Sequence, residues 1–137
     1  MSVPTILEEI KIISKVDLHA STVSLRSDGI IHLELHPVEE LIVKDAWEII
    51  EAIKRIGNGK KFPNLVTATD YVNINKEAKV LSASEEGNQY TLADAIVVNS
   101  IALKLIANFY ISFNKPVRPT KLFSSEEKAV EWLKTFL

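Results

Sequence analysis

The sequence contains no cysteine among its 137 residues. This absence excludes a disulfide framework, a thiolate nucleophile and any zinc or iron–sulfur site built on cysteine ligands. Chains without disulfides are typical of the reducing cytoplasm, and we expect the protein to be cytoplasmic. Glycine and proline are also scarce, with four and five copies, which argues against a disordered chain.

An excess of positive charge is missing as well. The formal net charge is -2, so the protein has no basic field that would attract a phosphate backbone, and we predict no binding to nucleic acid. The N-terminal stretch MSVPTILEEIKII has acidic residues where a secretory signal would be apolar. The longest apolar segment, residues 99–113, is shorter than the roughly 20 residues of a membrane span. We therefore expect a soluble protein with no membrane span.

The motifs of common enzymes are absent too. The sequence has no G-x-S-x-G nucleophile elbow and no glycine-rich phosphate loop that opens a helix. Glu85 and Glu86 are adjacent, so their side chains point apart and do not form an acid/base pair. We predict no catalytic residues, no cofactor and a protein that is not an enzyme.

A metal site is the most specific chemical alternative. His32, Glu34 and His36 alternate along one predicted strand, which puts imidazole and carboxylate groups on one face. However, side chains two residues apart on a strand diverge from a single ion, and no fourth ligand is evident. We expect the three side chains to share one side and to bind no metal.

What the sequence does contain is a set of alternating strands and helices. Residues 17–26 and 30–36 form a predicted hairpin around the turn Ser27-Asp28-Gly29, with Arg26 opposite Ile30. This register places one face of the hairpin in the core and the other in solvent. Residues 1–15 stay ambiguous, because Ile6, Ile10 and Ile13 fit a helix face while Ile10, Ile12 and Ser14 fit a strand.

Helices and strands then follow in turn. Residues 44–56 have the period of a helix with one buried stripe, and residues 64–69 form a short strand. A helix over 76–82 precedes the segment 84–89, which is too polar for a core and is predicted to be a surface loop. Ser124-Ser125-Glu126-Glu127 is a capping box that opens a last helix over 125–136, also with one buried stripe.

The stretch 93–123 is the strongest unit of the chain, and it predicts a strand, a helix and a second strand. Its helix, residues 99–113, is apolar except for one stripe spaced four residues apart, formed by Ser100, Lys104, Asn108 and Ser112. Such a helix is covered on most of its sides. The cover is either the helices 44–56 and 125–136 or a second copy of the chain, and we expect a homodimer.

This order of elements predicts an α/β fold with a mixed sheet, an N-terminal β-hairpin and βαβ units. No repeat, low-complexity tract or linker divides it, so residues 1–137 form a single domain. This order, and especially the strand and helix that lead to KLFSSEEKAVEWL, resembles the STAS-like (SpoIIAA-like) fold of bacterial anti-anti-sigma factors, while the runs ADAIVVNSIALKLIANFY and SSEEKAVEWL resemble a smaller family within it. The sequence is most similar to a family of small, uncharacterised bacterial proteins with that fold.

The resemblance implies a non-enzymatic regulatory module that binds another protein. In STAS regulators, a loop resembling Asp-Ser-Ser/Thr-Gly after the third strand is phosphorylated, and the matching residues here are 67–71, without the glycine. Thr69 is the nearest hydroxyl, although Thr69 and Asp70 are better explained as the end of a strand and the cap of the next segment. The expected binding surface consists of Thr69, Asp70, Tyr71, Asn73, Ser84, Glu85, Glu86, Asn88 and Tyr90.

An alternative function is a carrier or sensor of a small apolar ligand or lipid. The resemblance implies it because STAS-like domains are grouped with CRAL-TRIO-like lipid carriers. Four aromatic residues are candidates for the lining of such a pocket, although residues at helical spacing more often belong to the core: Phe109, Tyr110, Phe113 and Trp132.

Overall fold

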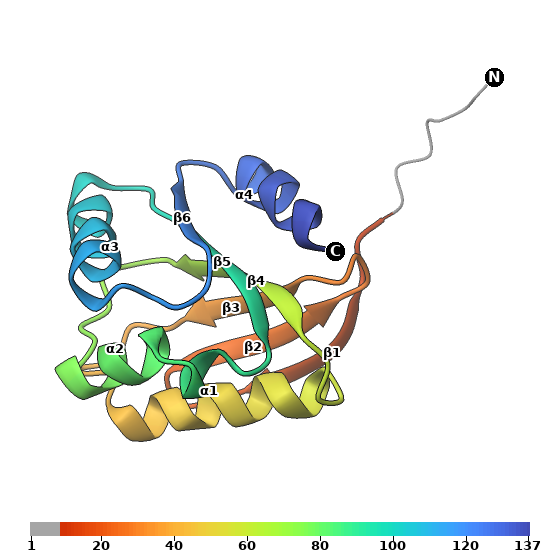
Figure 1. Ribbon diagram of the computed structural model, residues 1–137, viewed down its shortest axis with the longest axis horizontal. Helices are drawn as coiled ribbons and strands as arrows, with labels where there is room; N and C mark the ends of the chain where they lie inside the picture. The colour runs from red at the N-terminus through yellow and green to blue at the C-terminus, as the bar shows by residue number, and fades with distance from the viewer. Residues whose placement is uncertain (1–8) are drawn as a thin grey trace.

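A computed structural model describes residues 9–137 and shows one six-stranded sheet with helices on both faces (Figure 1). The strands lie in sequence order across the sheet: β1 Ile12–Asp17, β2 Ser21–Arg26, β3 Ile31–Leu35, β4 Phe62–Ala68, β5 Thr91–Val97 and β6 Thr120–Phe123. The first three are antiparallel, and β3 to β6 are parallel. The predicted α/β fold with a mixed sheet is confirmed.

The helices are α1 Val43–Ile56, α2 Lys76–Ala83, α3 Ile101–Asn114 and α4 Glu126–Leu133, with short 3-10 helices Glu86–Asn88 (η1) and Lys134–Phe136 (η2). Ser125 caps α4, because its hydroxyl accepts a hydrogen bond from the backbone N–H of Lys128. Each helix in the chain after β3 connects two parallel strands or follows the last one, which is the arrangement that parallel pairing requires.

The hairpin of β2 and β3 has the predicted register. Leu25 lies opposite Ile31 and Ser24 lies opposite His32, while Gly29 closes the turn at a φ of 83°. The prediction that one face is solvated is wrong for β2, since Thr22 and Ser24 are only 7% and 3% exposed. The reason is that β2 is an interior strand, with β1 on one side and β3 on the other, so neighbouring side chains close over its short polar ones.

The ambiguous N-terminal segment provides the first strand. β1 pairs antiparallel with β2, from Ile12 opposite Arg26 to Asp17 opposite Thr22, with an irregularity between Ile12 and Ser14. β1 is an edge strand whose side chains are mostly exposed, so its sequence has no burial pattern to reveal it. Ile6, which belonged to the helical alternative, lies outside the described residues.

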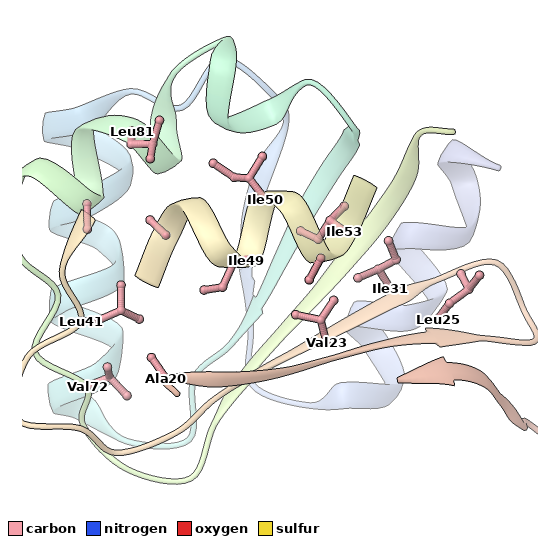
Figure 2. Close-up of a cluster of buried hydrophobic side chains, with 13 residues drawn as sticks. Ala20, Val23, Leu25, Ile31, Leu41, Ile49, Ile50, Ile53, Val72 and Leu81 are labelled. Carbon is pink, nitrogen blue, oxygen red and sulfur yellow. The ribbon is translucent and has the colours of Figure 1, made fainter. Parts of the chain in front are cut away.

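Two hydrophobic clusters flank the sheet. The larger one joins β2 and β3 to α1 and α2, and Figure 2 shows Ile50 of α1 on the side of Leu81 of α2, with Val23 and Ile31 of the strands on the other side of α1. The smaller one joins β4 and β5 to α4 through Leu65, Ala129 and Leu133. The predicted single buried stripe is confirmed for α1 and for α4.

Helix α3 does not take the central place that its sequence predicts. It lies at the end of the molecule away from β1 (Figure 1), and Ala107 is its one buried residue. Within one chain it is not covered on most sides, so the alternative in which α1 and α4 provide the cover is wrong, while cover by a second copy stays a prediction. The physical reason is the topology: α1 and α2 already cover the rest of this sheet face, so α3 packs with one side over β6 and beside α2.

The polar segment 84–89 also differs from its prediction at one position. Asn88 is 3% exposed, because its amide nitrogen donates hydrogen bonds to the backbone carbonyls of Ser82 and Ser84, at 2.8 and 2.7 Å. These carbonyls lie at the end of α2, where a helix leaves its last C=O groups without intrahelical partners. Asn88 is therefore an internal cap, while Glu85, Glu86 and Gln89 are exposed as a surface loop requires.

Candidate functional site

An apolar cavity of about 210 Å³ lies between the sheet and the three helices α1, α2 and α3. Side chains from all of these elements form its wall. Leu35 and Ile96 approach from the strands, Ile49 and Ile50 from α1, and Ile106 from α3. Because α3 is one wall of the cavity and packs with only one side, the cavity is closed by the least buried helix of the fold.

A row of polar side chains crosses the sheet at the cavity. The strand register places Asn64 of β4 beside Asp94 of β5, and Asp94 beside Thr120 of β6. The Asn64 amide nitrogen donates to Asp94 Oδ1 at 3.2 Å and to Thr91 Oγ1 at 3.1 Å. All four residues line the cavity, so its apolar wall contains one polar patch. We call Asn64, Thr91 and Asp94 the polar cluster.

The electrostatics of the polar cluster are dominated by Asp94. Burial removes water from its carboxylate and raises its pKa from 3.8 to about 6, while the hydrogen bond from Asn64 opposes this shift. Asp94 is half-buried by surface area, because one part of its side chain faces the cavity. Burial also raises the pKa of the Tyr110 hydroxyl, and the charge of Asp94 adds to this effect.

One buried acceptor of the polar cluster has no partner within residues 9–137. Asn64 is 3% exposed, and its side-chain oxygen Oδ1 receives no hydrogen bond although the nitrogen of the same amide makes two. A buried polar atom without a partner costs about 1–3 kcal/mol, so such atoms are rare in native folds. The described chain therefore leaves one buried acceptor unsatisfied beside the cavity.

A second feature lies on the outer side of α3. Four large apolar residues spaced four apart are exposed: Ile101 at 79%, Leu105 at 65%, Phe109 at 57% and Phe113 at 64%. The rings of Phe109 and Phe113 stack with their centres 5.2 Å apart. Spacing of four residues keeps all four on one side of the helix. We call these four residues the α3 stripe.

The two loops predicted as a binding surface lie at opposite ends of the parallel strands. Thr69, Asp70, Tyr71 and Asn73 follow the carboxyl end of β4 and are exposed. Residues 84–90 precede the amino end of β5, which is parallel to β4. A seven-residue strand is about 23 Å long, so the two segments do not form one continuous surface.

The second loop segment has mainly structural contacts. The Ser84 hydroxyl donates to the Leu81 carbonyl at 2.6 Å and accepts from the N–H of Gly87 at 3.0 Å. Glu85 forms an ion pair with Arg118 at 3.4 Å, and Tyr90 is half-buried against the larger cluster. Glu86 begins the 3-10 helix η1 and is exposed.

The two histidines in and after β3 contact different partners and do not converge on one point. His32 and His36 share one side of the sheet with Glu34, as predicted, but His32 Nε2 contacts Thr67 Oγ1 at 2.8 Å while His36 Nε2 contacts Thr22 Oγ1 at 2.8 Å. Burial lowers the pKa of His32. Across residues 9–137, no three His, Asp or Glu side chains are grouped so that they could hold a metal ion.

Of the four aromatic residues proposed for a pocket, only Tyr110 lines the cavity. Phe109 and Phe113 point outward, and Trp132 packs between Phe123 and Phe136 on the α4 face. The sequence reasoning missed Asn64, Thr91 and Asp94. Their signal was present, because Asn64 and Asp94 interrupt two mostly apolar interior strands, but their proximity depends on the register of β4 and β5.

Comparisons with known proteins first identify the fold. The crystal structure of an uncharacterized protein from the DUF3478 family, with a SpoIIAA-like fold, from Shewanella loihica PV-4 aligns with a TM-score of 0.53 and 14% identity. The alignment covers 96% of this chain and 99% of that one. The protein therefore has a SpoIIAA-like fold, and the resemblance to STAS-like domains is confirmed at the level of fold.

The family follows from the sequence. The family described as "Domain of unknown function (DUF7793)" matches residues 23–137, from β2 to the C-terminus, and the chain belongs to it. A protein with unknown function from Arthrobacter sp. FB24 shares 22% identity over 81% of this chain and 96% of its own, with a TM-score of 0.29. No curated protein matches the sequence. Within the described residues, no helix has the length and apolarity to cross a membrane.

Proposed function

We propose that the protein is a non-enzymatic, protein-binding regulatory module whose docking surface is the α3 stripe. The observation that carries this proposal is the exposure of Ile101, Leu105, Phe109 and Phe113 along one side of a single helix. Large contiguous apolar patches are rare on proteins that act alone, and they mark interaction sites. Helix-mediated docking through apolar residues one turn apart is a common recognition mode.

The partner in this proposal is a second copy of the chain. If a large apolar side chain has about 150–250 Å² of surface, the exposed parts of the four stripe residues sum to roughly 500 Å². A standard interface buries about 800 Å² on each partner, so the stripe and a polar rim around it are large enough for a dimer. A twofold axis across α3 would place each stripe against its own copy.

Charge supports a copy of the chain over a charged partner. Lys104 is the one charged residue in α3 Ile101–Asn114. Antiparallel pairing across a twofold axis would separate the two copies of Lys104 and leave uncharged side chains at the centre. A surface that selects a strongly charged partner would instead need charges of one sign around it.

The loop at the carboxyl ends of the strands belongs to the same proposal. This loop follows β4 and consists of Thr69, Asp70, Tyr71 and Asn73, while Ile101 begins α3 after the neighbouring strand β5. The loop and the start of α3 therefore lie at the same end of the parallel strands. Phosphorylation of exposed Thr69 would add charge next to the docking surface and thereby change binding. The absence of cysteine supports action in the cytoplasm.

Sedimentation velocity of the full chain at micromolar concentration tests the docking surface. We expect a species of twice the 15.3 kDa chain mass. The double substitution Leu105→Ser and Phe109→Ser is expected to yield a folded monomer, because both side chains are exposed and contribute little to the fold of one chain. Ile13→Thr, which removes an equally exposed apolar side chain from β1 at the far edge of the sheet, is the matched control and should remain a dimer.

Two results would contradict this proposal. A wild-type mass of one chain at all concentrations would show that a second copy does not occupy the stripe. A dimer that persists in the Leu105→Ser and Phe109→Ser variant would show that another surface joins the two copies. Circular dichroism of each variant confirms that a change in mass does not come from unfolding.

A further inference from the structure

The cavity beside α3 combines apolar walls with one carboxylate, that of Asp94, which forms no ion pair within residues 9–137. Asn64 Oδ1 is buried and unpaired within the described chain, and Asp94 accepts its hydrogen bond from Asn64 through Oδ1. Lys79 also lines the cavity, but no ion pair joins it to Asp94 among residues 9–137. If position 94 served only to fill the core, an apolar residue would be expected there, because burying a carboxylate without a cationic partner is costly.

We propose that this cavity is a binding site for a small apolar molecule that carries a protonated amine, with the amine at the polar cluster. The carboxylate of Asp94, which lines the cavity, is the acceptor, and a protonated amine has three donors. A cation is preferred over a neutral donor because it offsets the desolvation of the carboxylate at the same time.

The walls define the rest of the ligand. Ile49, Ile50, Ile96 and Ile106 bring only carbon atoms to the cavity, so the body of the ligand is apolar. A cavity of about 150 Å³ holds benzene. By proportion, the present 210 Å³ suits a molecule of about eight or nine non-hydrogen atoms. A single aromatic ring with a short aminoalkyl chain has this size.

Tyr110 gives the site a second polar group. Its hydroxyl is buried, lines the cavity and lies close enough to Asp94 for the carboxylate charge to affect it. It stands on α3, whereas the polar cluster stands on β4 and β5. The ligand would therefore contact both the sheet and the helix that closes the cavity. Binding there does not depend on what occupies the outer stripe of α3.

Isothermal titration of the full chain at pH 7.5 with three probes of matched size tests the site. The probes are 2-phenylethylamine, which is protonated at this pH, 2-phenylethanol, which keeps a neutral donor, and propylbenzene, which has none. We expect the amine to bind at least tenfold more tightly than either of the others. Asp94→Asn should weaken amine binding at least tenfold and leave propylbenzene unaffected.

Two control variants complete the test. Glu131→Gln removes an exposed carboxylate from α4 and should leave all three affinities unchanged. Ile96→Phe adds volume inside the cavity and should weaken all three probes. Equal affinity for the amine and the alcohol, amine binding that survives Asp94→Asn, or no binding of any probe to a folded wild-type chain would overturn the proposal. None of these results bears on the mass of the dimer, so the two proposals can fail separately.

Discussion

Asp94 makes the stability of this protein depend on pH. Its pKa is about 6 in the folded chain, against 3.8 as the ordinary value. Between these values the unfolded chain releases the proton that the folded chain keeps, so the free energy of unfolding falls as pH rises through this window. Above pH 6 the loss is complete and amounts to about 2–3 kcal/mol.

Asp94→Asn should therefore stabilise the protein most at neutral pH. The asparagine keeps an oxygen that accepts the hydrogen bond from Asn64 but carries no charge to desolvate. We expect the variant's gain in the free energy of unfolding to be larger at pH 7.5 than at pH 4.5 by about 2 kcal/mol. Urea titrations of both proteins at the two pH values measure this difference. A gain that is the same at both values would mean that the carboxylate is not desolvated in the folded chain.

His32 changes stability in the opposite direction and has to be separated from Asp94. Burial lowers its pKa below 6.5, so its contribution is present above that value and is lost as pH falls. The pH dependence of the wild-type free energy of unfolding therefore contains the contributions of both Asp94 and His32. Comparison of Asp94→Asn with the wild type at one pH cancels the contribution of His32, because both proteins carry it.

At the scale of elements, α3 shows how a pattern of hydrophobicity can mislead. Its polar residues Ser100 and Lys104 are exposed, as expected, but the adjacent apolar residues Ile101 and Leu105 are exposed as well. The sequence identifies which residues are apolar, but it does not state whether the same chain or another molecule covers them. The excess of apolar residues over what the sheet buries is the observation on which the proposed docking surface rests.

The junction between α2 and η1 depends on a close approach of two backbone segments. A Cβ added at Gly87 would lie 2.0 Å from the carbonyl oxygen of Leu81, which is backbone and cannot move aside. We expect Gly87→Ala to lower the free energy of unfolding by about 2–4 kcal/mol. Gly59→Ala is the control: the position has a φ of 74° but open space around it, so its cost should be about 1 kcal/mol. Equal losses in urea titrations of the two variants would show that the junction relaxes.

At the scale of the whole molecule, most of the fold was predictable because burial leaves a periodic pattern. The hairpin register followed from Arg26 opposite Ile30, and α1 followed from its isoleucines. β1 was not predictable, since an exposed edge strand has no such pattern. The polar cluster was also hidden: Asn64 and Asp94 are thirty residues apart, and only the parallel register of β4 and β5 brings them together.

The two hydrophobic clusters raise the question of whether the domain unfolds as one unit. They lie on opposite faces of one sheet and are linked by neighbouring strands. β4 contributes Leu65 to the cluster on the α4 side, and β3 contributes Ile31 to the cluster on the α1 side. Loss of either cluster would leave one face of the same strands uncovered. We therefore expect cooperative, two-state unfolding, as in most domains of this size.

The two tryptophans report on the two faces, because Trp47 lies on α1 and Trp132 on α4. In the single-tryptophan variants Trp132→Phe and Trp47→Phe, the fluorescence and circular dichroism of each protein should change at one and the same urea concentration. Adding Leu133→Ala, which empties a fully buried position of the smaller cluster, should destabilise the chain by about 2–5 kcal/mol. It should shift the transition reported by Trp47 as much as the one reported by Trp132. A shift confined to Trp132 would show that α4 and its cluster unfold independently of the α1 face.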